Sequence, residues 1–106
     1  SQYARYRLPF FDRKRRLTWA VTPSGDYGAD CNAGRAYAIK FLKSCDGTCG
    51  WASLLGKITA DMICAGSSGT LPNGRPEING VVIGFMSAIG EALAGAIAEH
   101  NHPKGA

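Results

Sequence analysis

The residues that could do chemistry are few in this 106-residue chain, and they are scattered. Both histidines, His100 and His102, fall in the last residues of the chain, and Ser53 and Lys57 stand four apart outside any recognised Ser–Lys motif. An enzyme of this size needs a nucleophile, a base and an orienting group close together. The sequence therefore predicts no catalytic set, no metal site and no cofactor, and we expect a protein that is not an enzyme.

The cysteines are the more informative reactive residues. Their spacings are 14, 4 and 15 residues, and the four are Cys31, Cys45, Cys49 and Cys64. They bracket two predicted helices, so an antiparallel pairing of these helices would bring Cys45 to Cys49 at the turn. The same pairing would place Cys31 opposite Cys64 at the open end.

Three interpretations of these cysteines compete. The first is two disulfides, which would fit an oxidising compartment. The second is four free thiols that act as ordinary small buried side chains. The third is a metal or iron–sulfur site, which the sequence disfavours because it contains no CxxC pair. No apolar segment typical of an export signal follows the basic start, although a signal cleaved before Ser1 would leave the same sequence. We therefore expect free thiols and a cytoplasmic protein.

Positive charge is concentrated at the N-terminal end. The net charge is +4, but residues 1–16 hold six basic residues against Asp12 alone, so the rest of the chain is nearly neutral. Such an arm is either a solvated loop or a contact for phosphates. Aromatic side chains interleaved with the basic ones also suit nucleic acid. Nucleic-acid binding is thus the alternative function, and its predicted contacts are Arg13, Lys14, Arg15 and Arg16.

The elements that must position these residues are mostly helices. Apolar and polar spacing predicts helices over residues 31–44, with Asp30 as N-cap, over residues 50–65, and over residues 77–100. Alternation at Leu17, Trp19 and Val21 favours an extended segment, and Pro9 would confine its neighbour to an edge. We expect a mainly α fold, in which residues 1–22 form an extended arm or short β-hairpin and residues 23–106 form a three-helix domain.

The third predicted helix is apolar almost all round, so it must be buried on most sides. It carries a row of large residues from Val81 to Ile97 and a parallel row of small ones. It could be a core helix, a dimerisation helix or a membrane span, and Glu91 within it argues against the membrane. We expect one face in the core and one against a second copy, with a dimer seam at Gly80, Gly84, Ala88 and Ala92.

Protein binding is the function that this combination favours. Arginine and aromatic residues are enriched at interface hot spots, and the first 21 residues hold five aromatic side chains. We expect a small regulatory protein that binds another protein, sequestering or inhibiting it as a homodimer, with no membrane partner. The predicted partner-binding residues are Tyr6, Phe10, Phe11, Trp19, Phe85 and Ile89.

Overall fold

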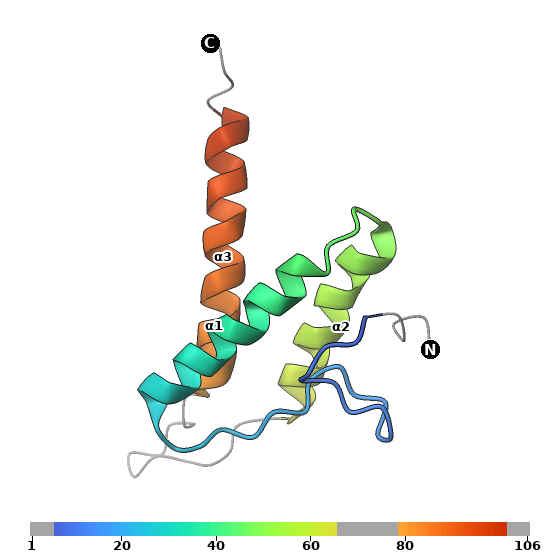
Figure 1. Ribbon diagram of the computed structural model, residues 1–106, viewed down its shortest axis with the longest axis vertical. Coiled ribbons are helices and arrows are strands. Elements are labelled where there is room, and N and C mark those ends of the chain that lie inside the picture. Colours follow the sequence, from blue (N-terminus) through green and yellow to red (C-terminus); the bar gives the residue numbers. More distant parts are fainter. Residues whose placement is uncertain (1–5, 66–78, 102–106) are drawn as a thin grey trace.

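The computed structural model describes residues 6–65 and 79–101, and within these ranges it is built from three helices and contains no strand. They are α1 (Tyr27–Lys43), α2 (Cys49–Ala65) and α3 (Gly80–Asn101). Figure 1 shows α1 crossing the first half of α3, with α2 and the N-terminal arm to one side. The predicted mainly α architecture is confirmed. His102 and the predicted start of the third helix at residue 77 lie outside the described residues.

The start of α1 corrects the predicted N-cap. Asp26 caps the helix, because its Oδ1 accepts a hydrogen bond of 3.1 Å from the backbone N–H of Ala29. Asp30 lies in the first turn and is buried, and its carboxylate accepts hydrogen bonds from the backbone N–H and the hydroxyl of Ser24. The carboxylate of Asp30 therefore closes the preceding loop onto the helix instead of capping it.

The other two helices begin near their expected positions. α2 starts one residue before the prediction and buries Leu54 and Ile58 completely. The side-chain oxygen of Asn79 accepts hydrogen bonds from the backbone N–H groups of Val81 (3.0 Å) and Val82 (3.3 Å). This oxygen satisfies donors that have no partner inside the helix, so it accounts for the start of α3 at Gly80.

Glycines allow α1 and α3 to cross with their backbones in contact. A Cβ atom at Gly34 of α1 would overlap the carbonyl oxygen of Val81 and would lie 2.7 Å from the backbone nitrogen of Phe85. A Cβ atom at Gly84 of α3 would overlap the carbonyl oxygen of Cys31. No other residue type fits at these two positions without moving the helices apart, so the two glycines fix the crossing point.

The arm enters the hydrophobic core. Phe10 is fully buried, and its ring centroid lies 5.3 Å from that of Trp19, 5.5 Å from that of Tyr37 in α1 and 5.6 Å from that of Phe85 in α3. Tyr6 is also buried, and its hydroxyl donates a 2.7 Å hydrogen bond to Asp46, between α1 and α2. The described part of the arm therefore shares one core with the helices.

A tight turn joins Asp12 to Leu17 in the arm. Asp12 and Leu17 form an antiparallel bridge through two reciprocal backbone hydrogen bonds of 2.9 Å. Arg16 completes the turn with a φ of 56°, a left-handed conformation that costs energy for a residue other than glycine. Where the sequence predicted either an extended arm or a short β-hairpin, the described part of the arm has a single antiparallel bridge at this turn.

Helices α1 and α2 meet at the ends that the turn connects. The rings of Phe41 and Trp51 stack with centroids 4.6 Å apart, and the indole N–H of Trp51 donates a 3.0 Å hydrogen bond to the hydroxyl of Ser44. Farther along, the helices diverge in Figure 1. Cys31 lies at the crossing of α1 with α3, so the antiparallel pairing that would place it opposite Cys64 is not what the chain adopts.

Candidate functional site

Most of the predicted partner-binding residues lie in the core. The exposed fractions of four of them are 5% or less, and these four are Tyr6, Phe10, Trp19 and Phe85. Their rings pack on one another or on the helices, so this part of the prediction is corrected: the aromatic arm stabilises the fold and offers these rings to no partner. Phe11 and Ile89 are partly buried and retain some exposed surface.

The predicted dimer seam also needs correction. Gly80, Gly84 and Ala88 are buried within the chain, and a Cβ atom at Gly80 would lie 2.9 Å from the carbonyl oxygen of Tyr27 in α1. The small side chains do allow another helix to approach α3 closely, as the sequence predicted. That helix is α1 of the same chain and not α3 of a second copy. Of the four predicted seam residues, only Ala92 is exposed.

The second half of α3 is the most prominent exposed apolar feature. It projects beyond its crossing with α1 in Figure 1, and every residue from Gly90 to Asn101 is exposed. Leu93 is 58% exposed, Ile97 is 49% exposed and Met86, nearer the crossing, is 37% exposed. The later members of the large row, Leu93 and Ile97, are exposed because α1 crosses α3 at an angle and covers only the beginning of α3.

These exposed residues belong to a regular stripe. We define the α3 seam as the residues that follow one another at spacings of four, three, four and three, namely Val82, Met86, Ile89, Leu93 and Ala96, with Ile97 beside them. Alternating spacings of three and four place side chains on one side of a helix. The seam is therefore a continuous apolar surface that begins at the core and runs out along the projecting half.

An ion pair marks a different side of α3. Glu91 accepts hydrogen bonds from Arg35 of α1, at 2.6 Å and 3.2 Å, and both side chains are exposed. The guanidinium hydrogen bond and charge lower the pKa of Glu91. At 100° per residue, Glu91 points away from the seam. The carboxylate of Glu91, whose charge is unfavourable for membrane insertion, thus links α3 to α1 and leaves the seam uncharged.

By length and composition α3 could cross a membrane, since it has 22 residues and a mean hydropathy of 1.9 in its most apolar window. Its first half, however, is packed against α1 and the arm. The exposed part, residues 90–101, is only about 18 Å long at 1.5 Å per residue. The hydrocarbon core of a bilayer is about 30 Å thick, so this part alone is too short to span it.

The four predicted nucleic-acid contacts occupy the turn of the arm, and all are exposed. The guanidinium of Arg15 pairs with Asp12 at 2.7 Å, and this hydrogen bond lowers the pKa of Asp12. Arg13 instead lines a pocket together with Arg7 and Lys40. No sequence pattern singles out Arg7 or Lys40, because only the fold brings the arm beside α1.

The four cysteines are free thiols. Cys45, Cys49 and Cys64 are exposed, whereas Cys31 is partly buried beside Gly84. A hydrogen bond with the Cys31 side chain raises the pKa of Tyr27. Among the described residues, no group of three or more histidine, cysteine or acidic side chains is arranged to hold a metal ion.

No protein-family model, curated protein or solved structure matches this chain. Among the described residues, the exposed features include the α3 seam, the pocket lined by Arg7, Arg13 and Lys40, and single apolar side chains elsewhere, such as Ile39 and Ile63.

Proposed function

We propose that the protein is a small protein-interaction module that acts as a homodimer, in which the α3 seam of one copy packs against the α3 seam of another. The observation that carries this proposal is the exposure of Leu93, Ile97 and Met86 along one side of a projecting helix. A contiguous exposed apolar stripe is typical of an interaction site.

The spacing of the seam favours a second copy as its occupant. Met86 and Leu93 are seven residues apart, as are Val82, Ile89 and Ala96, which is the repeat of two helices that pack side by side. The same surface on two copies can interdigitate about a two-fold axis. The seam holds no charged residue, so two copies do not repel each other there.

The regulatory part of the proposal has narrower support. Of the residues expected to bind another protein, Ile89 lies in the seam itself and Phe11 keeps some exposed surface. A regulated partner would insert an amphipathic helix against the seam and would compete with the second copy. The free thiols support a reducing compartment such as the cytoplasm for this role.

Sedimentation of two matched variants tests the proposal. Leu93→Asp puts a charge in the middle of the seam, and we expect it to raise the dimer dissociation constant about tenfold or more. Ala98→Asp puts the same charge on an exposed residue about 140° around the helix from Leu93, on the side opposite the seam, and should leave association nearly unchanged. Equal effects of the two variants, or a wild-type protein that is monomeric at high micromolar concentration, would refute the homodimer.

A further inference from the structure

A tight turn of the arm presents consecutive basic residues to solvent. We define the basic turn as residues 13–16, with the sequence Arg-Lys-Arg-Arg, and all of them are exposed. The reciprocal backbone hydrogen bonds between Asp12 and Leu17 close this turn. Phe10 and Trp19, which lie just before and just after it, are buried in the core. The chain is thus anchored on both sides of the basic turn, and its charges occupy a fixed place on the protein.

The positive charge of the basic turn is only partly balanced. The guanidinium of Arg15 pairs with Asp12, but 69% of the Arg15 side chain is exposed, and exposed pairs of this kind are weak. Lys14 and Arg16 form no ion pair with any described residue. A fixed group of cations on the surface attracts polyanions.

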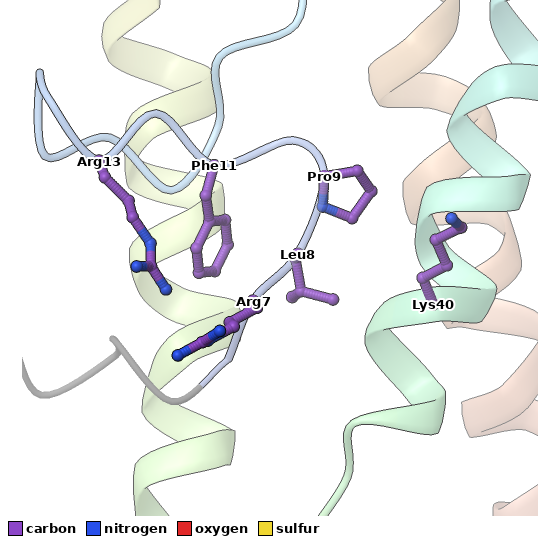
Figure 2. A pocket seen from close by; sticks show the side chains of 6 residues that line it. All are labelled: Arg7, Leu8, Pro9, Phe11, Arg13 and Lys40. Atoms are coloured by element: carbon purple, nitrogen blue, oxygen red, sulfur yellow. The ribbon is translucent and has the colours of Figure 1, made fainter.

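Arg7 extends the positive surface along the arm. It is exposed and lines a pocket together with Arg13. In Figure 2, the guanidinium groups of these two arginines lie apart from the ammonium group of Lys40, with Leu8 and Pro9 between them. The positive surface therefore belongs to the arm, whose described part holds five basic side chains and one acidic one.

The backbone of Arg16 adopts a conformation that is unfavourable for its residue type. Its φ is 56°, in the left-handed region where a Cβ atom is crowded and glycine is favoured. Arginine at this position therefore costs free energy of folding that glycine would not, and its exposed side chain forms no ion pair with the described residues. Such conformations are concentrated at functional sites. A need for the guanidinium in binding accounts for the cost.

The burial of the aromatic rings in the arm decides which polyanion fits. Tyr6, Phe10 and Trp19 are at most 5% exposed, so they offer the bases of a single strand no surface on which to stack. The basic turn has no apolar side chain that could enter a bilayer. Its arginines present paired donors that match phosphate oxygens. Cations without stacking rings fit a nucleic-acid backbone.

We propose that the basic turn binds the phosphate backbone of double-stranded nucleic acid without reading its sequence. Lys14 and Arg16 contact phosphates directly, and Arg15 joins them by exchanging Asp12 for a phosphate. A duplex is favoured because it carries more charge per unit length than a single strand. The arm lies to the side of α2 in Figure 1, away from the projecting half of α3, so this binding does not depend on the α3 dimer.

Fluorescence anisotropy with the full chain tests the ligand class. The probes are a labelled DNA duplex of about 20 base pairs, its single strand and a second duplex of unrelated sequence, at about 50–200 mM salt. We expect both duplexes to bind equally, at least as tightly as the single strand. The logarithm of the affinity should fall with that of the salt concentration with a slope between about −2 and −4.

Three results would overturn the proposal. They are no binding of duplex at about 50 mM salt, tighter binding of the single strand, and an affinity that does not change with salt. Phosphatidylserine vesicles supply the same charge as a lipid surface. If the protein binds these vesicles through Lys14 and Arg16 but does not bind duplex, the partner is a membrane and the proposal is wrong.

Matched variants test the location of the contact. Lys14→Gln and Arg16→Gln should each weaken duplex binding about tenfold at about 50 mM salt and reduce the steepness of the salt dependence by about one. Lys43→Gln is the control, because it removes the same charge from an exposed position on α1. If Lys43→Gln weakens binding as much as Lys14→Gln, the effect comes from overall charge and the basic turn is not the site.

Arg16→Gly distinguishes a role in binding from a role in folding. It removes the same charge as Arg16→Gln and also relieves the left-handed backbone. We expect it to weaken duplex binding as much as Arg16→Gln does, while its urea midpoint equals or exceeds that of the wild-type protein. A variant that binds duplex normally, or one that has a lower urea midpoint, would show that Arg16 serves the fold and would overturn the proposal.

Discussion

The carboxylate of Asp61 in α2 accepts two hydrogen bonds from Thr18 of the arm, one from the backbone N–H at 2.7 Å and one from the hydroxyl at 2.8 Å. Its other oxygen accepts a 2.7 Å hydrogen bond from Lys57. Thr18 and Asp61 are both 6% exposed. This buried contact ties the arm to α2, while Phe10 and Trp19 of the arm pack on α1 and α3.

Removing the carboxylate should destabilise the protein. Asp61→Leu leaves the buried backbone N–H of Thr18 without its acceptor, and we expect a loss of about 2–3 kcal/mol in the free energy of unfolding. Thr18→Val removes only the hydroxyl donor and should cost about 1 kcal/mol. Urea denaturation measures both, and Thr22→Val at an exposed position of the same segment is the control. A wild-type midpoint for Asp61→Leu would show that this contact does not hold the arm.

The same carboxylate predicts a pH dependence. Burial raises the pKa of Asp61, but the hydrogen bonds from Lys57 and Thr18 outweigh it and leave the pKa below its ordinary value. Asp30 behaves in the same way, because hydrogen bonds from the backbone N–H and the hydroxyl of Ser24 lower its pKa. The stabilisation from these carboxylates is therefore complete when the pH is above their pKa in the unfolded chain, about 3.9. It is lost as the pH falls through their lower pKa in the folded protein.

We accordingly expect a nearly constant urea midpoint between about pH 7 and pH 5 and a steep decrease below about pH 4. Asp61→Asn should be less stable at neutral pH and should lose less stability on acidification. If the variant and the wild-type protein lose stability in parallel down to pH 3, the titration of Asp61 makes no contribution.

Replacing glycine by alanine should have opposite effects on stability at Gly34, where α1 crosses α3, and at Gly95, beyond the crossing. Gly34→Ala would drive a methyl group into the backbone of α3, and we expect it to cost about 2–3 kcal/mol or more. Gly95→Ala, where a Cβ atom meets nothing within 4 Å, should stabilise α3 by about 0.5–1 kcal/mol. Thermal melts of the two variants compare them directly. Equal effects of the two substitutions would mean that α1 and α3 do not touch at Gly34.

Thiol labelling tests the redox state. Cys45, Cys49 and Cys64 are exposed and should react quickly in the native protein, whereas the partly buried Cys31 should react more slowly. The denatured and unreduced protein should take up four labels. An uptake of two or none would mean that disulfides form in the protein as isolated, and it would favour an oxidising compartment.

Periodicity was sufficient to predict the helices of this fold. The apolar spacing of α2 and the long, mostly apolar segment of α3 predicted both elements to within a few residues, because a sustained apolar pattern at helical spacing is a strong signal for a helix. The cap of α1 was misassigned to Asp30 because Asp26 and Asp30 both precede plausible helical turns. Only the contact between Asp30 and Ser24 shows that Asp30 has another role.

Contacts between elements were harder to predict. The small residues of α3 correctly indicated a close helix contact, but spacing alone does not say whether the partner helix belongs to the same chain. Gly34 of α1, which completes that crossing, had no repeated pattern to reveal it. Tyr6, Phe10 and Trp19 were assigned to a surface because arginine and aromatic residues together are typical of interfaces, although these three side chains are buried in the core. The pocket formed by Arg7, Arg13 and Lys40 depends on the same docking.

The claim that α3 pairs with α3 is tested most directly by a filtered NMR experiment on a mixture of isotope-labelled and unlabelled protein, in which only contacts between copies give signals. We expect concentration-dependent signals between copies from the methyl groups of Met86, Leu93 and Ile97. Signals between copies from the arm or α2 alone, or no such signals at high micromolar concentration, would contradict it.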